Sequence, residues 1–336
     1  MPRNIHYLAA IGFTLGLGLQ GASAQPDTLT LYSAQHPQVD AMLVAAFTKE
    51  TGIKVRVHEG EGPDIASQII QEGSASPADV FFTENSPELN LLDEKQLLAP
   101  VAPGTLSQIP AQYNAQDGDW LGVLARENVL AFNPDEINAS ALPPSLLDLA
   151  KPEWKGKVGI APSDADFLPL VSAVIKQYGK PAALAWLQGL KENGAIYQDD
   201  EGVVAAVNRG SVATGIINNY YWYRLETELG ADKTISRIHH FSDGDIGALI
   251  NVSGAAILKS SRHQAEAQKF LAFLVSPSAQ EMLGASNIDY EYPLRPGVSA
   301  NKKLPPFKSL QPPVISVSQL GDDQEAGQLL QQAGLI

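Results

Sequence analysis

The sequence predicts an α/β protein with two lobes, on the basis of three observations. The chain has 336 residues, and because a domain usually takes about 100–200 residues, it has room for two hydrophobic cores. Hydrophobic residues make up 44% of the chain and charged residues 18%, which is typical of a globular protein. Short β-rich runs alternate with amphipathic runs, and this alternation predicts mostly parallel sheets with helices on both faces.

The alternation is clearest in the first part of the chain. Strands are expected at 28–33, 53–58 and 79–83, which are short runs rich in β-branched and aromatic residues. Helices are expected at 38–50 and 63–70, where apolar residues recur with helical spacing. Parallel sheets bind ligands beyond the carboxyl ends of their strands. The loops after the first and third strands are therefore candidate ligand-binding loops.

The later part of the chain continues this pattern, with a polar, Gln-rich helix expected near the C-terminus. The further strands are expected at 128–132, 157–160, 212–217 and 248–258, and the further helices at 169–178, 181–191, 202–209 and 263–275. These elements predict a second α/β lobe, but composition alone does not place the boundary between the lobes.

The N-terminus has the features of a cleaved signal peptide. Arg3 supplies a positive charge, and residues 8–19 form an apolar stretch that is too short for a typical membrane span. The small residues at 22–24 fit a cleavage site, so we expect residues 1–24 to be removed; an uncleaved anchor is the alternative. No later stretch of about 18 apolar residues is present, so the mature protein is not expected to be membrane-embedded.

Charge and composition exclude several functional classes. The net charge of −14 makes the chain a poor general binder of nucleic acid or of anionic membranes. The absence of cysteine excludes disulfides, thiolate zinc sites, iron–sulfur clusters and cysteine nucleophiles. Neither a G-x-S-x-G motif nor a P-loop is present, so no catalytic residue is assigned and the protein is not expected to be an enzyme.

The most unusual local feature is the run Tyr-Tyr-Trp-Tyr at 220–223, which follows a predicted strand and Asn218. Aromatic packing or a sugar-stacking face is the simpler interpretation. Ligation of a metal by phenolate is the more specific one. Because the pKa of tyrosine is near 10, only a strongly charged cation displaces its proton. Ferric iron is the natural candidate, since hard cations prefer oxygen ligands.

Two further candidate ligands lie in loops beyond the carboxyl ends of predicted parallel strands, where such sheets usually bind ligands. His36 follows the first predicted strand, and Glu84 follows the third. Each is a weak indication alone, because a single His or Glu is more often structural. Together with Tyr220 and Tyr221 they would supply one nitrogen and three anionic oxygens. Such a set neutralises a trivalent ion and leaves one or two positions for water or an anion.

Several motifs resemble the periplasmic ferric ion-binding proteins of bacterial ABC iron importers. They are Tyr-Ser-Ala-Gln-His at 32–36, Ala-Asp-Val-Phe-Phe-Thr-Glu-Asn at 78–85, and Ile-Asn-Asn-Tyr-Tyr-Trp at 217–222, with weaker likenesses at 153–157 and 253–261. The resemblance implies a two-lobed type II solute-binding fold, also called a bacterial transferrin. Each lobe would be a mixed, mostly parallel sheet flanked by helices. Two crossover strands would join the lobes, near 127–132 and 246–253.

The resemblance also implies which residues form each lobe and which residues bind the metal. Residues 25–127 and 252–300 would form the first lobe, and residues 128–251 and 301–336 the second. His36, Glu84, Tyr220 and Tyr221 match the metal ligands of the family. The protein would be a periplasmic monomer that captures Fe³⁺ between its lobes and delivers it to an ABC transporter permease in the inner membrane.

In this family a synergistic anion, often phosphate, completes the metal shell. The matching positions are Asn85, Ser163, Asp164, Ala165 and Asn218. The chain departs from the family where Asp164 replaces a Gly, where Asp200 replaces an Asn, and where an additional Asp166 is present. Carboxylates repel an anion, so carbonate, citrate or water are alternatives to phosphate.

Three alternatives to iron binding compete with this hypothesis. A type II binding protein for a small organic solute, such as an organic anion, a polyamine or a thiamine-like molecule, would use Trp222 and the tyrosines as a stacking wall. A periplasmic hydrolase lacks a nucleophile–base pair in this sequence. Zinc or manganese is disfavoured because zinc sites prefer His, Cys and carboxylate to paired phenolates.

Overall fold

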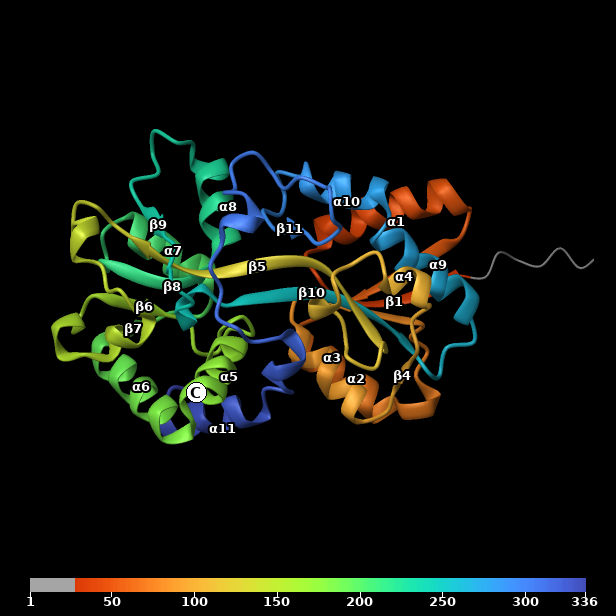
Figure 1. Ribbon diagram of the computed structural model, residues 1–336, viewed down its shortest axis with the longest axis horizontal. Helices are drawn as coiled ribbons and strands as arrows, with labels where there is room; N and C mark the ends of the chain where they lie inside the picture. The colour runs from red at the N-terminus through yellow and green to blue at the C-terminus, as the bar shows by residue number, and fades with distance from the viewer. Residues whose placement is uncertain (1–27) are drawn as a thin grey trace, which may run out of the picture.

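The computed structural model describes residues 28–336, so the signal peptide expected at 1–24 lies outside the described residues. Figure 1 shows an elongated molecule with an α/β half at each end and two long strands running between them. These strands are β5 (Trp120–Phe132) and β10 (Ile250–Leu258). The predicted α/β class is thereby confirmed.

The first half is built around a mixed sheet with the strand order β2-β1-β3-β10-β5. Strand β1 pairs in parallel with β2 on one side and with β3 on the other, as the sequence pattern predicts. The elements are β1 (Thr28–Ala34), α1 (Pro37–Thr51), β2 (Lys54–Glu59), α2 (Gly62–Glu72), β3 (Val80–Thr83), α3 (Ser86–Glu94), β4 (Leu98–Ala99), α4 (Pro103–Leu106), α9 (Gln264–Leu274), α10 (Pro277–Gly284) and β11 (Tyr292–Pro293).

The second half continues the strand order as β5-β8-β6-β7, with β9 also paired to β5. Here β6 pairs in parallel with both β7 and β8, whereas β5 is antiparallel to β8. The elements are β6 (Val158–Ile160), α5 (Phe167–Tyr178), α6 (Lys180–Asn193), β7 (Gly194–Ile196), α7 (Asp200–Asn208), β8 (Thr214–Asn218), α8 (Asn219–Leu229), β9 (Arg237–His239) and α11 (Gln324–Ala333).

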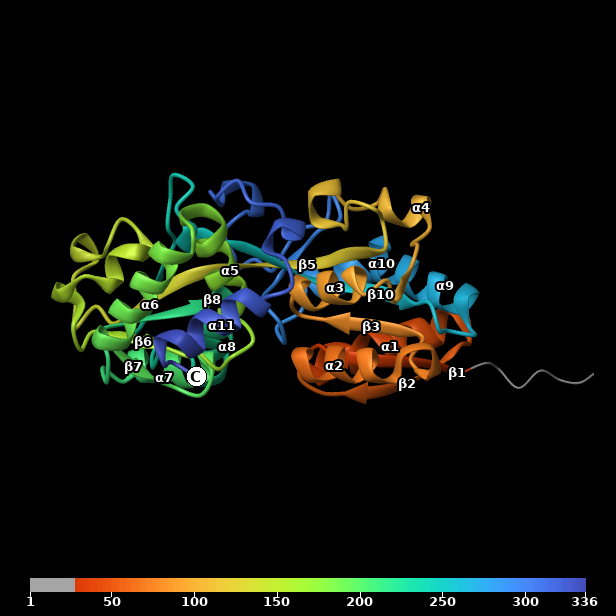
Figure 2. The ribbon, with the colours of Figure 1, turned by 90° about the horizontal axis from the view of Figure 1, so that it is seen from below.

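Strand β5 connects the two sheets directly. Residues 120–127 pair with β10, and residues 128–132 pair with β8. The sequence analysis expected this strand to start at 128, but it begins eight residues earlier, at Trp120. The earlier start was missed because all residues of the strand are buried, so the run lacks the polar alternation that marks a strand with one exposed face. A third passage between the halves is made by the C-terminal chain, since α11 packs beside α5 and α6, as Figure 2 shows from below.

Helix α8 is the main element that the sequence analysis missed. The expected strand β8 ends at Asn218, and α8 starts at the next residue, so the aromatic run forms its first turn. The side chain of Asn219 fixes this start, since its Oδ1 accepts the backbone N–H of Glu127 at 2.8 Å. The tyrosines are thus tied to the strand that joins the halves.

Two apolar clusters form the cores. One packs rings such as Phe47, Phe81 and Trp120 around the first sheet, and the other packs Phe167 against Trp186 in the second half. Among the residues that the structure describes, no helix is both long and apolar enough to cross a bilayer.

Candidate metal centre

Three segments that are far apart in the sequence meet where the two halves face each other, and together they carry the four predicted ligands. His36 lies between β1 and α1, Glu84 between β3 and α3, and Tyr220 and Tyr221 in the first turn of α8. Each residue therefore follows the carboxyl end of a strand, as expected for a ligand site in an α/β sheet. The structure brings together all four predicted metal ligands.

The contacts among these four residues are direct. His36 Nδ1 lies 3.3 Å from Glu84 Oε1, and the Tyr220 hydroxyl donates to Glu84 Oε2 at 3.2 Å. The rings of Tyr220 and Tyr221 are tilted against each other with centroids 4.1 Å apart. The hydroxyl oxygens thus face carboxylates from other segments and are not buried in hydrocarbon, which argues against a purely apolar packing role.

Asp166 is a fifth member of the group that the sequence analysis did not include among the ligands. It immediately precedes α5. Its Oδ2 accepts hydrogen bonds from Tyr220 at 2.7 Å and from Tyr221 at 3.1 Å, and its Oδ1 accepts from Asn85 Nδ2 at 3.1 Å. The signal was present in the sequence as the additional carboxylate beside the predicted anion turn. Its direction toward the tyrosines depends on the packing of the two halves.

Arg126 is the buried cation of the site. It lies on β5 with a fully buried side chain, and its Nη2 is 3.0 Å from Asp166 Oδ1. The guanidinium also donates to the Glu84 carbonyl oxygen and to Asn85 Oδ1. Its Nη1 is 3.7 Å from Glu291 Oε1. A buried charge requires such partners, so Arg126 joins both halves around the site. The available sequence signal was Arg126, followed by Glu127 and Asn128, in a run that is otherwise apolar.

Burial and neighbouring charge set the protonation of the metal-free site. Burial, reinforced by Asp166, raises the pKa of both Tyr220 and Tyr221 well above the usual value. Burial also raises the pKa of Glu84, to about 7, although His36 opposes it. Burial acts to raise the pKa of Asp166, but the charge of Arg126 and the hydrogen bonds from Tyr220 and its other donors together outweigh burial, and the pKa is lowered. The tyrosines are therefore neutral donors to an ionised Asp166 until a cation displaces their protons.

His36 is held between groups of opposite charge. Burial lowers its pKa, but Glu84 and Asp289 outweigh burial and raise the pKa to about 9, against the opposing effect of Arg224. Asp289 Oδ2 is 3.4 Å from His36 Nδ1, and Arg224 Nη1 is 3.0 Å from His36 Nε2. Neither Asp289 nor Arg224 was singled out from the sequence.

A cavity of about 590 Å³ adjoins the metal centre. Its lining includes four of the five predicted anion-binding residues, namely Asn85, Ser163, Asp164 and Ala165. The fifth, Asn218, donates its backbone N–H to Asp200 Oδ2 at 3.0 Å. Within residues 28–336, no lysine or arginine lines this cavity, whereas its carboxylates are those of Glu61, Glu84, Asp164, Asp166, Asp199 and Glu201. The predicted anion site thus faces a strongly acidic wall.

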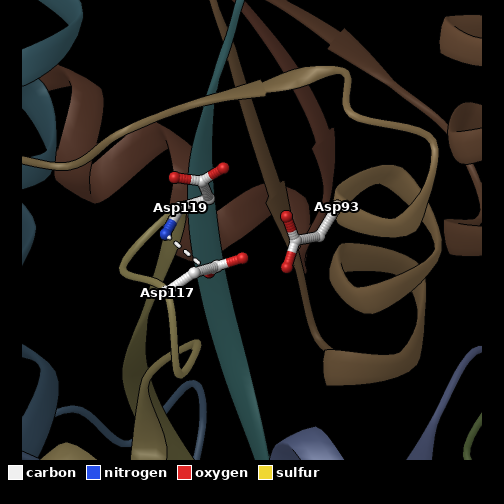
Figure 3. A group of neighbouring side chains, drawn as sticks. All are labelled: Asp93, Asp117 and Asp119. Atoms are coloured by element: carbon white, nitrogen blue, oxygen red, sulfur yellow. Dashed lines mark hydrogen bonds between the residues drawn. The ribbon is translucent and has the colours of Figure 1, made fainter.

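A second group of carboxylates lies away from this cavity, in the first half (Figure 3). Asp93 from α3 approaches Asp117 and Asp119, which precede β5, and one oxygen from each lies within 4.8 Å of the others. The backbone N–H of Asp119 donates to Asp117 Oδ1 at 3.2 Å. Burial, followed by the charges of Asp117 and Asp119, raises the pKa of Asp93 to about 6.

The fold and the site together define a two-lobed solute-binding protein of the type II periplasmic class. The structure superposes on iron-bound HitA from Pseudomonas aeruginosa with a TM-score of 0.88 and 44% identity, covering 92% of this chain and 100% of that one. It also matches the Trichodesmium protein solved with iron and citrate, with a TM-score of 0.80 and 31% identity, covering 92% of this chain and 99% of that one.

The chain belongs to the family of bacterial extracellular solute-binding proteins, which it matches over residues 42–309. It is 40% identical over 329 residues to the Fe(3+)-binding periplasmic protein of Serratia marcescens, covering 98% of this chain and 96% of that one. It is 37% identical over 326 residues to the major ferric iron-binding protein of Neisseria meningitidis, covering 96% of this chain and 97% of that one. These relatives are binding proteins, and their names do not indicate enzymes.

Proposed function

We propose that this protein captures Fe³⁺ in the periplasm and delivers it to an ABC transporter permease of the inner membrane. One observation is central to this proposal. The hydroxyls of Tyr220 and Tyr221 converge, in a buried space between two sheets, on carboxylates supplied by other segments. The ferric-binding names of the relatives, and the iron bound in the Pseudomonas structure, support the same function.

The proposed ligands are Tyr220, Tyr221, Glu84 and His36. Two phenolates and a carboxylate are hard anionic donors, which suit a trivalent cation, and imidazole is a common ligand for iron. In the proposed division of the chain, residues 25–127 and 252–300 supply His36 and Glu84. Residues 128–251 and 301–336 supply the tyrosines. Only the closed arrangement would then satisfy the ion, so the ion favours closure by shifting a population.

Asp166 competes with the exogenous anion that the family resemblance implies. Its carboxylate already accepts from both tyrosines and pairs with Arg126. We therefore propose that Asp166 supplies the negative charge that an outside anion would otherwise bring. A phosphate or carbonate at Asn85, Ser163, Asp164, Ala165 and Asn218 would bind beside a cavity lined by several carboxylates, which charge repulsion disfavours.

Iron capture requires no covalent step. The cation displaces the hydroxyl protons of Tyr220 and Tyr221, which leave to solvent, and the resulting phenolates bind the ion. Arg126 keeps Asp166 and the Glu84 backbone in place while the charge of the site changes. The proposal assigns the chain a role as a monomeric carrier and not as an enzyme.

The visible spectrum tests this function. Adding a ferric salt to the metal-free mature protein should produce a tyrosinate-to-iron charge-transfer band that saturates stoichiometrically. The band should vanish in the double variant Tyr220→Phe/Tyr221→Phe, and Tyr178→Phe, which alters an exposed tyrosine, is the matched control. A missing band in the wild type, or a band that persists in the double variant, contradicts the proposal. Thermal stabilisation by an organic solute but not by iron would instead indicate the organic-solute alternative.

A further inference from the structure

We propose that Asn219 is a positioning residue for Tyr220 and Tyr221, the two tyrosines that the proposed function assigns as phenolate ligands. Its side-chain amide holds the first turn of α8 against β5 and against the segment that precedes β11. The inference rests on the proposed function, since it explains how two of the proposed ligands are placed. It goes beyond that function by assigning a role to a residue that is not itself a proposed ligand.

The first bond of Asn219 is made at the point where β5 passes from one sheet to the other. Asn219 is the first residue of α8 and is fully buried. Strand β8 pairs with β5 only as far as Asn218, opposite Asn128, because the chain then turns into the helix. The adjacent backbone N–H of β5, that of Glu127, donates to Asn219 Oδ1 at 2.8 Å. The side chain thus supplies the acceptor that β8 no longer provides and that a buried N–H requires.

The second bond uses the other end of the same amide. Asn219 Nδ2 donates to the backbone carbonyl oxygen of Tyr290 at 3.1 Å. Tyr290 is fully buried between α10 and β11, and its hydroxyl lies 2.5 Å from Thr227 Oγ1, further along α8. An asparagine amide carries both an acceptor oxygen and a donor nitrogen. The two bonds together therefore fix where the helix begins and how it is oriented.

Both partners of Asn219 belong to the half of the molecule that does not contain α8. Glu127 lies in the part of β5 that pairs with β10, and Tyr290 lies just before β11. The same half contains His36 and Glu84. Asn219 therefore links the helix that carries the tyrosines directly to the half that carries the other two proposed ligands.

The tyrosine hydroxyls depend on this link because the two tyrosines directly follow Asn219 in the chain. The hydroxyls of Tyr220 and Tyr221 both donate to Asp166, at 2.7 and 3.1 Å. Their rings contact each other, with centroids 4.1 Å apart. A displacement of the first turn of α8 would therefore move both hydroxyls together, away from the side chains with which they would share the ion. Loss of a group that holds metal ligands in place lowers metal affinity by about 10–100-fold.

Replacement of Asn219 tests the proposal, with a second buried asparagine as the matched control. Asn219→Ala should weaken Fe³⁺ binding by about 10–100-fold in competition with citrate, and should shift the charge-transfer band, because both phenolates lose their alignment. The control is Asn193→Ala. Asn193 is buried at the end of α6 in the same half as α8, and its Nδ2 donates to the carbonyl oxygens of Leu149 and Lys151 at 2.9 and 2.6 Å. Both variants should unfold at lower urea concentration, but the control should keep the affinity and the band of the wild type.

Two results with these variants would overturn the proposal. Unchanged affinity and an unchanged band in Asn219→Ala would show that the tyrosines are placed without this residue. Equal losses of affinity in Asn219→Ala and Asn193→Ala would reduce its role to general stability. A wild-type protein without a charge-transfer band would overturn the proposed function, and this inference with it, so the two failures are distinguished.

A crystal structure of the wild-type protein loaded with ferric iron keeps the proposal testable if Asn219→Ala fails to fold. Both hydrogen bonds of Asn219 should be present while Tyr220 and Tyr221 bind the ion, because a positioning contact must persist in the state that it supports. Loss of either bond in the iron-bound protein would overturn the proposal.

Discussion

Two groups of neighbouring carboxylates in the described residues differ in their exposure, in the kinds of side chain that accompany them and in the segments that supply them. Asp93, Asp117 and Asp119 lie within one half of the molecule, are partly exposed, and offer a single kind of donor. The group at the cleft combines carboxylates with two phenols and an imidazole. Its members come from both halves of the molecule. His36 follows β1, Glu84 follows β3, Asp166 precedes α5, and Tyr220 and Tyr221 lie in the first turn of α8.

The difference teaches what a site for a trivalent cation requires beyond clustered acids. At the cleft, Asp166 is buried and Glu84 is partly buried, and the fully buried Arg126 contacts both residues. The tyrosine hydroxyls lose their protons and become negatively charged only when a cation binds. The metal-free site therefore carries less negative charge than the metal-bound ligands supply. The group of Asp93, Asp117 and Asp119 offers carboxylate oxygens alone, with neither a phenol nor an imidazole, so its donors do not favour a trivalent ion over a divalent one.

The largest expected effect is that of pH on iron binding. Because both tyrosines are protonated in the metal-free protein, each bound ion releases two protons from them. Affinity should therefore fall as pH falls, by about 100-fold per pH unit from the two tyrosines alone, and more steeply where His36 and Glu84 are also protonated. Titrations against a chelator of known protonation between pH 8 and 5.5 measure this slope. A slope near zero would place iron on groups that are already ionised, such as the exposed aspartates.

Loss of Arg126 should have the next largest effect. Arg126→Met removes the cation from a site with several buried carboxylates, and leaving buried charges unpaired costs about 3–5 kcal/mol. Urea unfolding of the metal-free protein at pH 7 measures the change in the free energy of unfolding. Arg209→Met, at an exposed position, is the control. Equal stability of the Arg126→Met variant and the wild type would show that the carboxylates there need no counter-charge.

Removal of Asp166 should produce a smaller loss of iron affinity, which added phosphate should partly restore. Asp166→Ala leaves Arg126 without its nearest carboxylate and should weaken iron binding by about 10–100-fold, as for other groups that support metal ligands. Phosphate should restore part of the affinity in this variant and none in the wild type. Asp199→Ala, which removes another carboxylate of the same cavity, is the control. Wild-type binding that requires phosphate would return the anion to its usual role in the family.

The smallest effect is expected at the exposed carboxylates. The triple variant Asp93→Asn/Asp117→Asn/Asp119→Asn should leave iron affinity unchanged. The pKa of Asp93 is raised to about 6, so its ionised form destabilises the fold above that pH. The triple variant should therefore gain about 0.5 kcal/mol of stability at pH 7.5, with little gain at pH 4.5. Loss of the charge-transfer band in this variant would reverse the comparison between the two groups.

The sequence predicted the parts of the site that depend on local pattern. His36 and Glu84 were expected because each follows a strand of a parallel sheet, and Tyr220 and Tyr221 because adjacent phenols after a strand are unusual. Asp166 was noted only as a departure from the family. Asp289 was missed because its neighbour His36 lies at the other end of the chain, and their contact depends on how α8 packs against the segment before β11.

Arg126 and the start of α8 illustrate a second reason for such misses. The run 120–132 is wholly buried, so it has none of the alternation that marks a strand with one exposed face. Its two charged residues, Arg126 and Glu127, are explained only by their partners in other segments, Asp166 and His240. The first turn of α8 is aromatic and buried on every side, so its period is equally hard to recognise from sequence.

Anomalous scattering at the iron edge, from crystals of the mature protein loaded with ferric iron, tests the central claim most directly. The account predicts a single strong peak bonded to the oxygens of Tyr220 and Tyr221 and to Glu84, with the imidazole of His36 completing the shell. A peak among Asp93, Asp117 and Asp119, or a peak in the cleft that lacks both phenolate oxygens, would contradict it.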